Sequence, residues 1–496
     1  MAEAYEPDPR RWKALAVTLA AGFMGLLDVS IVNTALPSIQ RNLHASNGAI
    51  QWVVSGYALT FGLVLVSGGR LGDALGRRRM FLFALAAFVA TSAFAGAAPD
   101  ETTLIVARLL QGCAAGMLTP QNSGMIQELF RGAERGRAFG MFGAVVGIST
   151  AVGPVLGGVI LAVFGDPDGW RWVFYVNVPI GVVAFGAALR LLPKTPPRKV
   201  RLRSEIDFVG ILLLAVAVLG VLLPLVESEQ GGLSRLWWLF GIAVVFGFAF
   251  VRWERTRVRL GRPPLLDIRL FTGTPGYAPG AAVGTLYFCG FAGIWLVFAM
   301  FFQKGLGYTP LQSGLAVTPF ALGSAVAAAV AGRLVPRWGR RLTVTGLSMV
   351  AAGMLLVALL ATLVPPSLTG VVFIAPLLFA GIGGGMVISP NTTLTLECVP
   401  PTMAGAAGGA LQTGQRIGTA IGTAVLASVF ESVVGAAPGR FPLALSVAMC
   451  CAAVVTCAAL VLAVLELRAR RARAVLTQGD KDRRDAETSA ADIQRG

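Results

Sequence analysis

The sequence predicts an all-α integral membrane protein with fourteen membrane-spanning helices. Of its 496 residues, 55% are hydrophobic and only 13% are charged, about half the charged share of an ordinary soluble domain. Residues 270–303 and 342–396 contain no Lys, Arg, Asp or Glu. Because a helix needs about 20 mostly apolar residues to cross the hydrocarbon, these stretches hold one and two spans. Lipid offers no partner to an unpaired backbone group, so the spans must be helical.

Apolar stretches separated by charged loops place the spans along the chain. The fourteen predicted spans cover residues 13–36, 50–72, 80–98, 103–125, 138–164, 172–192, 207–226, 236–253, 277–302, 312–335, 342–364, 370–392, 405–434 and 441–466. They divide the chain into a cytoplasmic N-terminus (1–12), a first six-helix half (13–192), a linker (193–206), an inserted helix pair (207–253), a second linker (254–276), a second six-helix half (277–466) and a cytoplasmic tail (467–496). The tail is rich in charge and poor in large apolar residues, and we expect it to be disordered.

The distribution of positive charge predicts the orientation of these spans. The net charge of +16 could suggest a nucleic-acid partner, but of the 41 Lys and Arg residues 34 fall on the side of the predicted N-terminus. Five fall in the opposite loops, and Arg108 and Arg416 lie within spans. This asymmetry is the positive-inside rule, and it predicts a multi-pass protein of the cell membrane with both termini in the cytoplasm. We expect no nucleic-acid partner.

An internal repeat explains why the spans divide into two halves. The segment GRLGDALGRR begins at Gly69 and GRLVPRWGRR begins at Gly332, with six identical residues at the same spacing. A weaker similarity pairs 149–153 with 418–422. Repeats at a fixed offset indicate duplicated structural units. Two halves of six helices with a binding site between them near the bilayer midplane are therefore expected.

The loop after the second span combines glycines with an acid and several arginines. Gly69 and Gly76 allow helix ends to approach through a tight turn. Asp73 can accept hydrogen bonds from a helix N-terminus or from an arginine, and the arginines at 77–79 anchor the cytoplasmic face. The alternative interpretation is a merely basic cytoplasmic loop. Pro336 replaces the acid in the second-half copy, so we expect these contacts to be asymmetric.

Two ionisable residues stand alone within apolar spans of the first half. Asp28 is the only charged residue from 14 to 40, and Arg108 lies in an apolar fourth span. At 1.5 Å per residue, both lie roughly 10–12 Å from the outer ends of their helices. A lone intramembrane arginine costs at least about 3 kcal/mol to insert, so it needs a partner or an aqueous cavity. A structural arginine bound to backbone carbonyls is the alternative.

Polar residues and helix breakers also occur in the fifth and thirteenth spans. Pro154 removes an intrahelical hydrogen bond, and the glycines at 153, 157 and 158 permit close packing and bending. Arg416 lies near mid-membrane with Gln412 and Gln415 on neighbouring turns. These three residues either line a polar cavity or satisfy carbonyls at a helix break.

These motifs resemble those of the major facilitator superfamily. Residues 69–79 are similar to its signature loop, which acts as a conformational latch through contact of the aspartate with the thirteenth span. Residues Arg108, Gln111 and Gly112 resemble its proton-linked motif, and 149–158 looks like the antiporter motif GxxxGPxxGG with Ser149 in place of the first glycine. Further matches to the fourteen-span drug:proton antiporters occur at Leu27, Asp28, Asn33, Ala35, Leu36 and Pro37, at Trp170–Gly181, from Asp207, at Pro264–Phe271 and from Tyr308.

The resemblance implies a secondary active transporter that exports small hydrophobic or amphipathic compounds, such as drugs or antibiotics, in exchange for protons. It implies proton coupling at Asp28 and Arg108, a latch of Gly69, Asp73, Gly76 and Arg77, and an antiporter motif of Gly153, Pro154, Gly157 and Gly158. We expect Asn33, Gln111, Gln412, Gln415 and Arg416 to line a substrate cavity. The expected partners are the substrate, protons and membrane lipids, and the expected state is a monomer. A dedicated exporter of one endogenous metabolite, a non-transporting receptor and a membrane enzyme are the alternatives.

Other residue patterns argue against catalysis. The chain has a single histidine, His44, and contains neither a phosphate-binding GxxxxGK[ST] loop nor a GxSxG elbow, which excludes a histidine-based metal site or triad. We expect no cofactor, no metal and no enzymatic activity. The aromatic residues Trp52, Tyr57, Trp237 and Trp238 lie near predicted membrane interfaces, where we interpret them as anchors.

Overall fold

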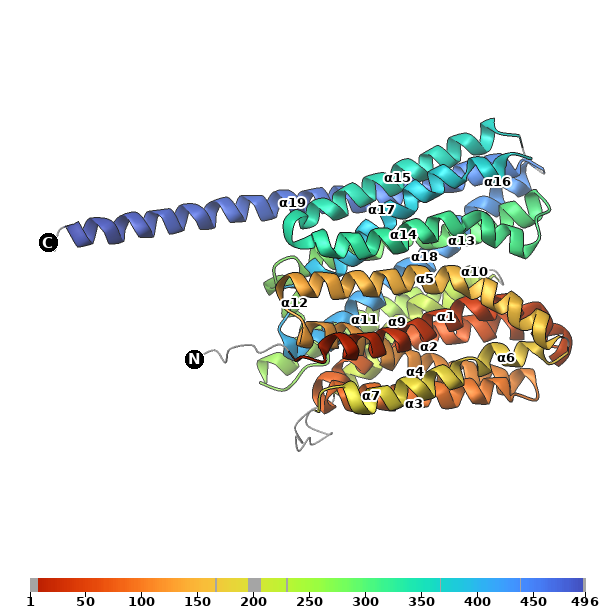
Figure 1. Ribbon diagram of the computed structural model, residues 1–496, viewed down its shortest axis with the longest axis horizontal. Coiled ribbons are helices and arrows are strands. Elements are labelled where there is room, and N and C mark those ends of the chain that lie inside the picture. The colour runs from red at the N-terminus through yellow and green to blue at the C-terminus, as the bar shows by residue number, and fades with distance from the viewer. Residues whose placement is uncertain are drawn as a thin grey trace.

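The computed structural model describes residues 8–165, 167–194, 207–228, 231–365, 367–437 and 439–493, and these form helices joined by short turns. The helices lie roughly parallel in two bundles, with the first half and the second half side by side (Figure 1). The described part of the chain begins and ends at the same end of the molecule (Figure 1). This end is called the terminal end below, and the other is called the far end.

The first half and the inserted region follow each other along the chain. The first half contains α1 (Arg11–Leu43), α2 (Asn47–Leu75), α3 (Arg77–Gly96), α4 (Glu101–Leu129), α5 (Gly132–Phe164), α6 (Gly169–Tyr175) and α7 (Asn177–Leu191). The inserted region contains α9 (Phe208–Val226), α10 (Gly232–Arg235), α11 (Trp238–Arg259) and α12 (Arg269–Gly273). The sixth predicted span is thus two helices that meet at Val176.

The second half repeats the arrangement of the first. It contains α13 (Tyr277–Met300) with the π-helical turn η2 (Phe301–Gly305), α14 (Pro310–Trp338), α15 (Arg340–Leu363), α16 (Thr369–Val372), α17 (Ile374–Thr395), the 3₁₀ turn η3 (Pro401–Met403), α18 (Ala404–Ala436) and α19 (Phe441–Ile493). The turns after α2 and α14 both need a glycine, since Gly76 and Gly339 have φ values of 96° and 48°, a region that disfavours side chains. These glycines occupy the same position in the two repeats.

The predicted count of fourteen spans is not supported. In the described part of the chain, twelve helices are long and apolar enough to cross a membrane. The other two predicted spans, α5 and α11, are helical but are not among the twelve. At α11 the apolar run from Leu236 to Val251 has 16 residues, and charged residues follow it from Arg252 onward.

The structure also differs from the prediction for the tail. The residues expected to be disordered continue α19 as a helix as far as Ile493, and this helix projects beyond the bundle (Figure 1). Alanine, arginine and glutamate are strong helix formers. Because the last span already supplies a helical nucleus, the tail can extend that helix without a separate nucleation step.

Glycine contacts join the two halves at the terminal end. A Cβ added at Gly69 of α2 would meet the carbonyl of Gly405 in α18, and one added at Gly332 of α14 would meet the carbonyl of Gly136 in α5. Gly69 and Gly332 are equivalent positions of the repeat. The molecule therefore has two related seams, α2 with α18 and α5 with α14, where small residues let the backbones touch.

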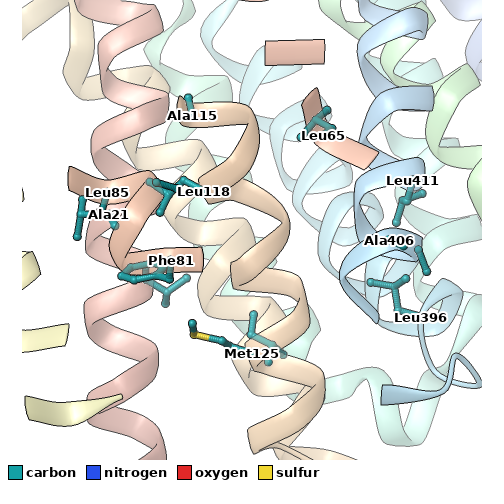
Figure 2. Packing of buried hydrophobic residues seen from close by; sticks show 14 of the residues in the cluster. Ala21, Leu65, Phe81, Leu85, Ala115, Leu118, Met125, Leu396, Ala406 and Leu411 are labelled. Atoms are coloured by element: carbon teal, nitrogen blue, oxygen red, sulfur yellow. The ribbon is translucent and has the colours of Figure 1, made fainter. Parts of the chain in front are cut away.

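Apolar packing between the halves is concentrated on the same side. The largest buried cluster combines first-half residues such as Leu65 and Leu118 with Ala406 and Leu411 of α18, as Figure 2 shows. At the far end of the first half, a separate cluster around Ile31 and Trp170 contains only first-half residues. The structure therefore represents a state in which the halves are closed against each other near the terminal end.

The inserted pair covers one of the two seams. On α9, Val218 and Leu222 pack with Leu59 of α2, and Ile417 and Ala420 of α18 pack against this cluster. Asp207 caps the N-terminus of α9 and also accepts a hydrogen bond of 2.8 Å from the indole N–H of Trp253 on α11. The pair is thus attached to the α2 and α18 seam through α9.

We predict that Gly69→Val abolishes most transport while the protein still inserts into the membrane. The valine side chain would collide with the backbone of α18, and such overpacking typically costs about 1–3 kcal/mol, which destabilises the closed terminal end. Solute flux in vesicles, normalised to the amount of inserted protein, measures the effect. Gly241→Val in α11 is the matched control, because a Cβ there meets nothing within 4 Å, and equal flux in both variants would contradict the prediction.

Candidate functional site

A buried ion pair lies at the centre of the first half. The guanidinium of Arg108 on α4 donates to Oδ2 of Asp28 on α1 at 2.5 Å, and both side chains are almost completely buried. The structure therefore brings together the two residues that the sequence places at equal depth. Burying an unpaired charge is very costly, so each residue of this pair compensates the buried charge of the other.

Three polar side chains complete this pair. The amide groups of Gln111 on α4 and Asn177 on α7 each donate to Oδ1 of Asp28 at 2.9 Å. Gln111 also donates to Ser92 on α3 at 2.7 Å and accepts a hydrogen bond from Arg108 at 2.6 Å. Every contact of the carboxylate is with a donor. The sequence motif pointed to Gln111, whereas Asn177 and Ser92 were missed because a single polar residue in an apolar helix has no distinctive spacing.

Backbone and aromatic contacts fix the position of Arg108. Its Nε donates to the carbonyl of Val53 at 2.9 Å, and its guanidinium lies 4.2 Å from the centre of the Tyr57 ring. The interpretation of Tyr57 as a membrane-interface anchor is therefore wrong. The residue is buried, and its hydroxyl donates to the carbonyl of Gly25 at 3.2 Å. Arg108 thus has both of the roles that the sequence left open, as an ion-pair partner and as a donor to a backbone carbonyl.

A small cavity of about 50 Å³ borders this network and lies between the halves. Eight of the residues that line it belong to the first half, and the ninth belongs to α18 of the second half. The lining consists of Val29, Val32, Asn33, Val54, Tyr57, Ala58, Phe61, Arg108 and Arg416. In this state the cavity has room for only a few water molecules. Its position between the halves means that its size must change whenever the halves move.

Arg416 faces this cavity from the second half. Its guanidinium lies 4.5 Å from the centre of the Phe61 ring, and no acidic side chain forms an ion pair with it within the described residues. The rings of Phe61 and Tyr57 are stacked, with centroids 6.1 Å apart. A continuous series of Arg108, Tyr57, Phe61 and Arg416 therefore forms one wall of the site, with a positive charge at each end.

The other expected cavity residues lie elsewhere. Gln111 is fully buried in the ion-pair network. Gln412 donates to the hydroxyl of Ser123 on α4 at 3.4 Å, so it bridges the halves. Gln415 is half-buried and does not belong to the lining of the cavity. Of the five residues expected to line the cavity, Asn33 and Arg416 do so.

The predicted latch residues form a compact cluster at the α2 and α18 seam. Asp73 accepts hydrogen bonds from the backbone N–H groups of Gly405 at 3.0 Å and Ala406 at 2.9 Å. An acid at a helix N-terminus is favoured by the helix dipole. Arg77 pairs with Asp73 and with Glu128, each at 3.0 Å, and also donates to the carbonyl of Pro401. Both residues therefore contact the opposite half.

The equivalent residues of the second half make different contacts. Arg340, the counterpart of Arg77, pairs with Glu466 of α19 at 2.5 Å and donates to the side chain of Asn391 in α17. Pro336 occupies the position of Asp73 and offers no side-chain acceptor. The second cluster therefore holds helices of its own half together, whereas the first joins the two halves.

The antiporter motif forms a packing contact inside the first half. A Cβ added at Gly153 would meet Ser30 of α1, and one added at Gly157 would meet Thr34 and Ile31. Gly158 has nothing within 4 Å. The backbone of α5 is one continuous helix here, and the side chain of Pro154 lies outside the described part of the structure. The motif thus brings α5 against the helix that carries Asp28.

The fold and these contacts agree with the similarity of the sequence to known proteins. The sequence matches the Major Facilitator Superfamily over residues 18–423 and, in a second overlapping match, over 280–488. The chain belongs to the major facilitator superfamily. It is a multi-pass membrane transporter and not an enzyme.

Individual relatives support this assignment. The chain is 37% identical over 422 residues to a puromycin resistance protein of Streptomyces alboniger, with 83% of this chain and 80% of the relative covered. It is 31% identical over 413 residues to a tetracenomycin C resistance and export protein of Streptomyces glaucescens, with 82% and 74% covered.

Solved structures show the same fold. The human organic anion transporter MFSD10 superposes with a TM-score of 0.67 at 16% identity, with 92% of this chain and 100% of that chain covered. The proton:xylose symporter XylE superposes with a TM-score of 0.62, also at 16% identity, with 90% and 94% covered.

We predict that Asp73→Asn slows transport several-fold without preventing membrane insertion. Hydrogen bonds to a charged group are worth about 1 kcal/mol more than neutral ones, so the amide weakens the attachment of α18 and lowers the population of this closed state. Initial rates of solute flux in vesicles measure the effect. Asp168→Asn, at an exposed ion pair of the far end, serves as the control. Wild-type flux in a normally inserted Asp73→Asn protein would contradict the prediction.

Proposed function

We propose that this transporter exports small hydrophobic or amphipathic compounds, such as drugs or antibiotics, in exchange for protons by alternating access. The observation that carries this proposal is the buried Asp28 and Arg108 pair beside a cavity that both halves line. A carboxylate in this position can bind a proton, and a cavity between the halves can open to either side. The names of the two antibiotic resistance relatives support the choice of drugs and antibiotics as substrates.

The proton step depends on which groups donate hydrogen bonds to the carboxylate of Asp28. In the closed state the carboxylate accepts hydrogen bonds from Arg108, Gln111 and Asn177. When the halves part, the side chain of Arg108 turns from Asp28 into the widened cavity that it lines, and the isolated carboxylate, destabilised by its apolar surroundings, takes up a proton. Return of Arg108 expels that proton. Tyr57 and Arg416 also lie at this site. The ring of Tyr57 faces Arg108, and Arg416 lies over the ring of Phe61.

The latch residues then couple this site to the movement of the halves. Separation of Asp73 and Arg77 from α18 opens the terminal end, and re-formation of these contacts closes it. The strong positive-inside bias supports the terminal end as the cytoplasmic end. A closed terminal end in this structure therefore corresponds to a state in which the substrate would be released outward.

We also propose that α5 and α11 cross the membrane, in addition to the twelve helices that are long and apolar enough to do so. The helix α5 has 33 residues, a length of roughly 50 Å, and it packs along α1 and α14. This length exceeds the hydrocarbon thickness of about 30 Å. The helix α11 packs along α9, and its apolar surface includes the exposed Val244 and Phe248. Crossing by both helices gives fourteen spans.

A dedicated exporter of one metabolite is the second candidate. One of the relatives has a name that refers to resistance to and export of a single compound, tetracenomycin C. A screen of resistance and export across chemically diverse compounds, in a host that lacks its own efflux pumps, separates the two candidates. Export of several unrelated compounds supports the multidrug proposal, and export of one compound supports the alternative.

We predict that Asp28→Asn abolishes proton-driven accumulation but leaves substrate binding and exchange. The amide keeps the volume and hydrogen-bonding capacity of the side chain but cannot carry the proton. Proteoliposomes that contain a pH-sensitive dye measure substrate-induced proton movement. Glu431→Gln, at an exposed acid near the far end of α18, is the matched control and should behave as wild type. Normal proton movement in Asp28→Asn would place the coupling acid elsewhere, and loss of that movement in Glu431→Gln would identify Glu431 as the coupling acid.

A second prediction separates coupling from folding. Removing one partner of a buried ion pair can cost about 3–5 kcal/mol, so Asp28→Asn also destabilises the protein. The double variant Asp28→Asn/Arg108→Gln removes both charges, and we expect it to recover thermal stability but not proton-driven export. Melting temperature and accumulation are measured on the same preparation. Recovery of both would show that the pair is structural only.

A further inference from the structure

We propose that the substrates of the site are organic anions with an aromatic body, and that Arg416 binds their acidic group. This inference rests on the proposed export function and narrows its substrate class. Arg416 faces the cavity between the halves and lies on the helix that the latch holds in place. It therefore meets a bound substrate from the second half, whereas Asp28 and Arg108 belong to the first half.

The charges around the cavity favour an anion. The guanidinium groups of Arg108 and Arg416 line it. The nearby carboxylate of Asp28 is fully buried and accepts hydrogen bonds from side chains of α4 and α7. No acidic side chain lines the cavity, and none within the described residues forms an ion pair with Arg416. The cavity therefore has an uncompensated positive charge. A cationic substrate would meet repulsion there, whereas an anion would supply the missing partner.

The shape of the wall explains why an aromatic body fits. Between the two guanidinium groups lie the stacked rings of Tyr57 and Phe61, with Val29, Val32 and Val54 beside them. A planar guanidinium binds carboxylate, sulfonate or similar groups through two parallel hydrogen bonds. An aromatic body can pack on the rings at the same time. The cavity must widen beyond its present 50 Å³, which happens as α18 moves away from α2.

This substrate class has a consequence for energy coupling. Exchange of one outgoing monoanion for one incoming proton moves two positive charges inward for each cycle. Exchange of a monocation for one proton moves none. An inside-negative membrane potential therefore drives the export of anions directly, and the two classes of substrate can be distinguished by their response to voltage.

The test uses the full-length protein with two aromatic dyes, fluorescein as the anion and ethidium as the cation. Binding is measured by fluorescence anisotropy in detergent, and transport is measured in proteoliposomes with an imposed pH difference or potassium diffusion potential. We expect binding of fluorescein and not of ethidium, and stimulation of fluorescein transport by the potential. Arg416→Gln should weaken fluorescein binding by at least about tenfold, and Arg416→Lys should retain part of it.

Two further variants make the test specific. Arg440→Gln removes the same charge from an exposed loop at the far end and should bind fluorescein as wild type does. Arg416→Glu should exclude fluorescein and admit ethidium. Wild-type affinity of Arg416→Gln for fluorescein, or stronger binding of ethidium than of fluorescein by the wild type, would overturn the inference and leave the proposed export untouched. Binding of fluorescein that depends on Arg416, without transport under any gradient, would instead overturn the export function.

Discussion

The constraint on which the first half depends is the need to compensate two charges in an apolar interior. Asp28 and Arg108 satisfy each other. Side chains of α4 and α7 donate to the carboxylate, the backbone of α2 accepts from Arg108, and Ser92 of α3 accepts from Gln111. A buried pair is favourable only when such additional hydrogen bonds are present. The network therefore fixes the relative positions of five helices, and it does so at the border of the cavity where a change of partner would have the greatest effect.

The contacts between the halves rely on small residues and not on a buried polar network. At the seams, glycines allow backbones to touch and separate without the rearrangement of large side chains, as Gly69 and Gly405 illustrate. Close packing of small residues gives dispersion energy but does not impose one fixed geometry. The molecule thus combines a polar network inside one half with smooth surfaces between the halves. Such a division allows each half to move as a unit.

Most spans and the division into two halves could be predicted from the sequence. Long stretches without charged residues indicate membrane spans, and the repeat of the Gly69 segment at Gly332 indicates two related halves. The depth of Asp28 and Arg108 followed from helical rise alone, whereas their direct contact depends on the rotation of α1 and α4. Asn177 and Tyr57 could not be assigned for the same reason, since packing decides whether a polar residue faces lipid, a cavity or a partner. The end of α11 was placed too early, at residue 253, because the prediction followed the apolar residues alone, whereas the helix continues through charged residues to Arg259.

The two seams differ in a way that bears on how the terminal end opens. The charged contacts of Asp73 and Arg77 with α18 all lie at the α2 seam, and α9 packs over that seam as well. At the α5 seam, Arg135 donates across the halves to the carbonyl of Glu397 at 3.2 Å, and glycines such as Gly136 and Gly332 pack against each other. Charge-assisted hydrogen bonds are the stronger kind. The charge-assisted contacts of Asp73 and Arg77 therefore add to the cost of separating the α2 seam, where the inserted pair is attached.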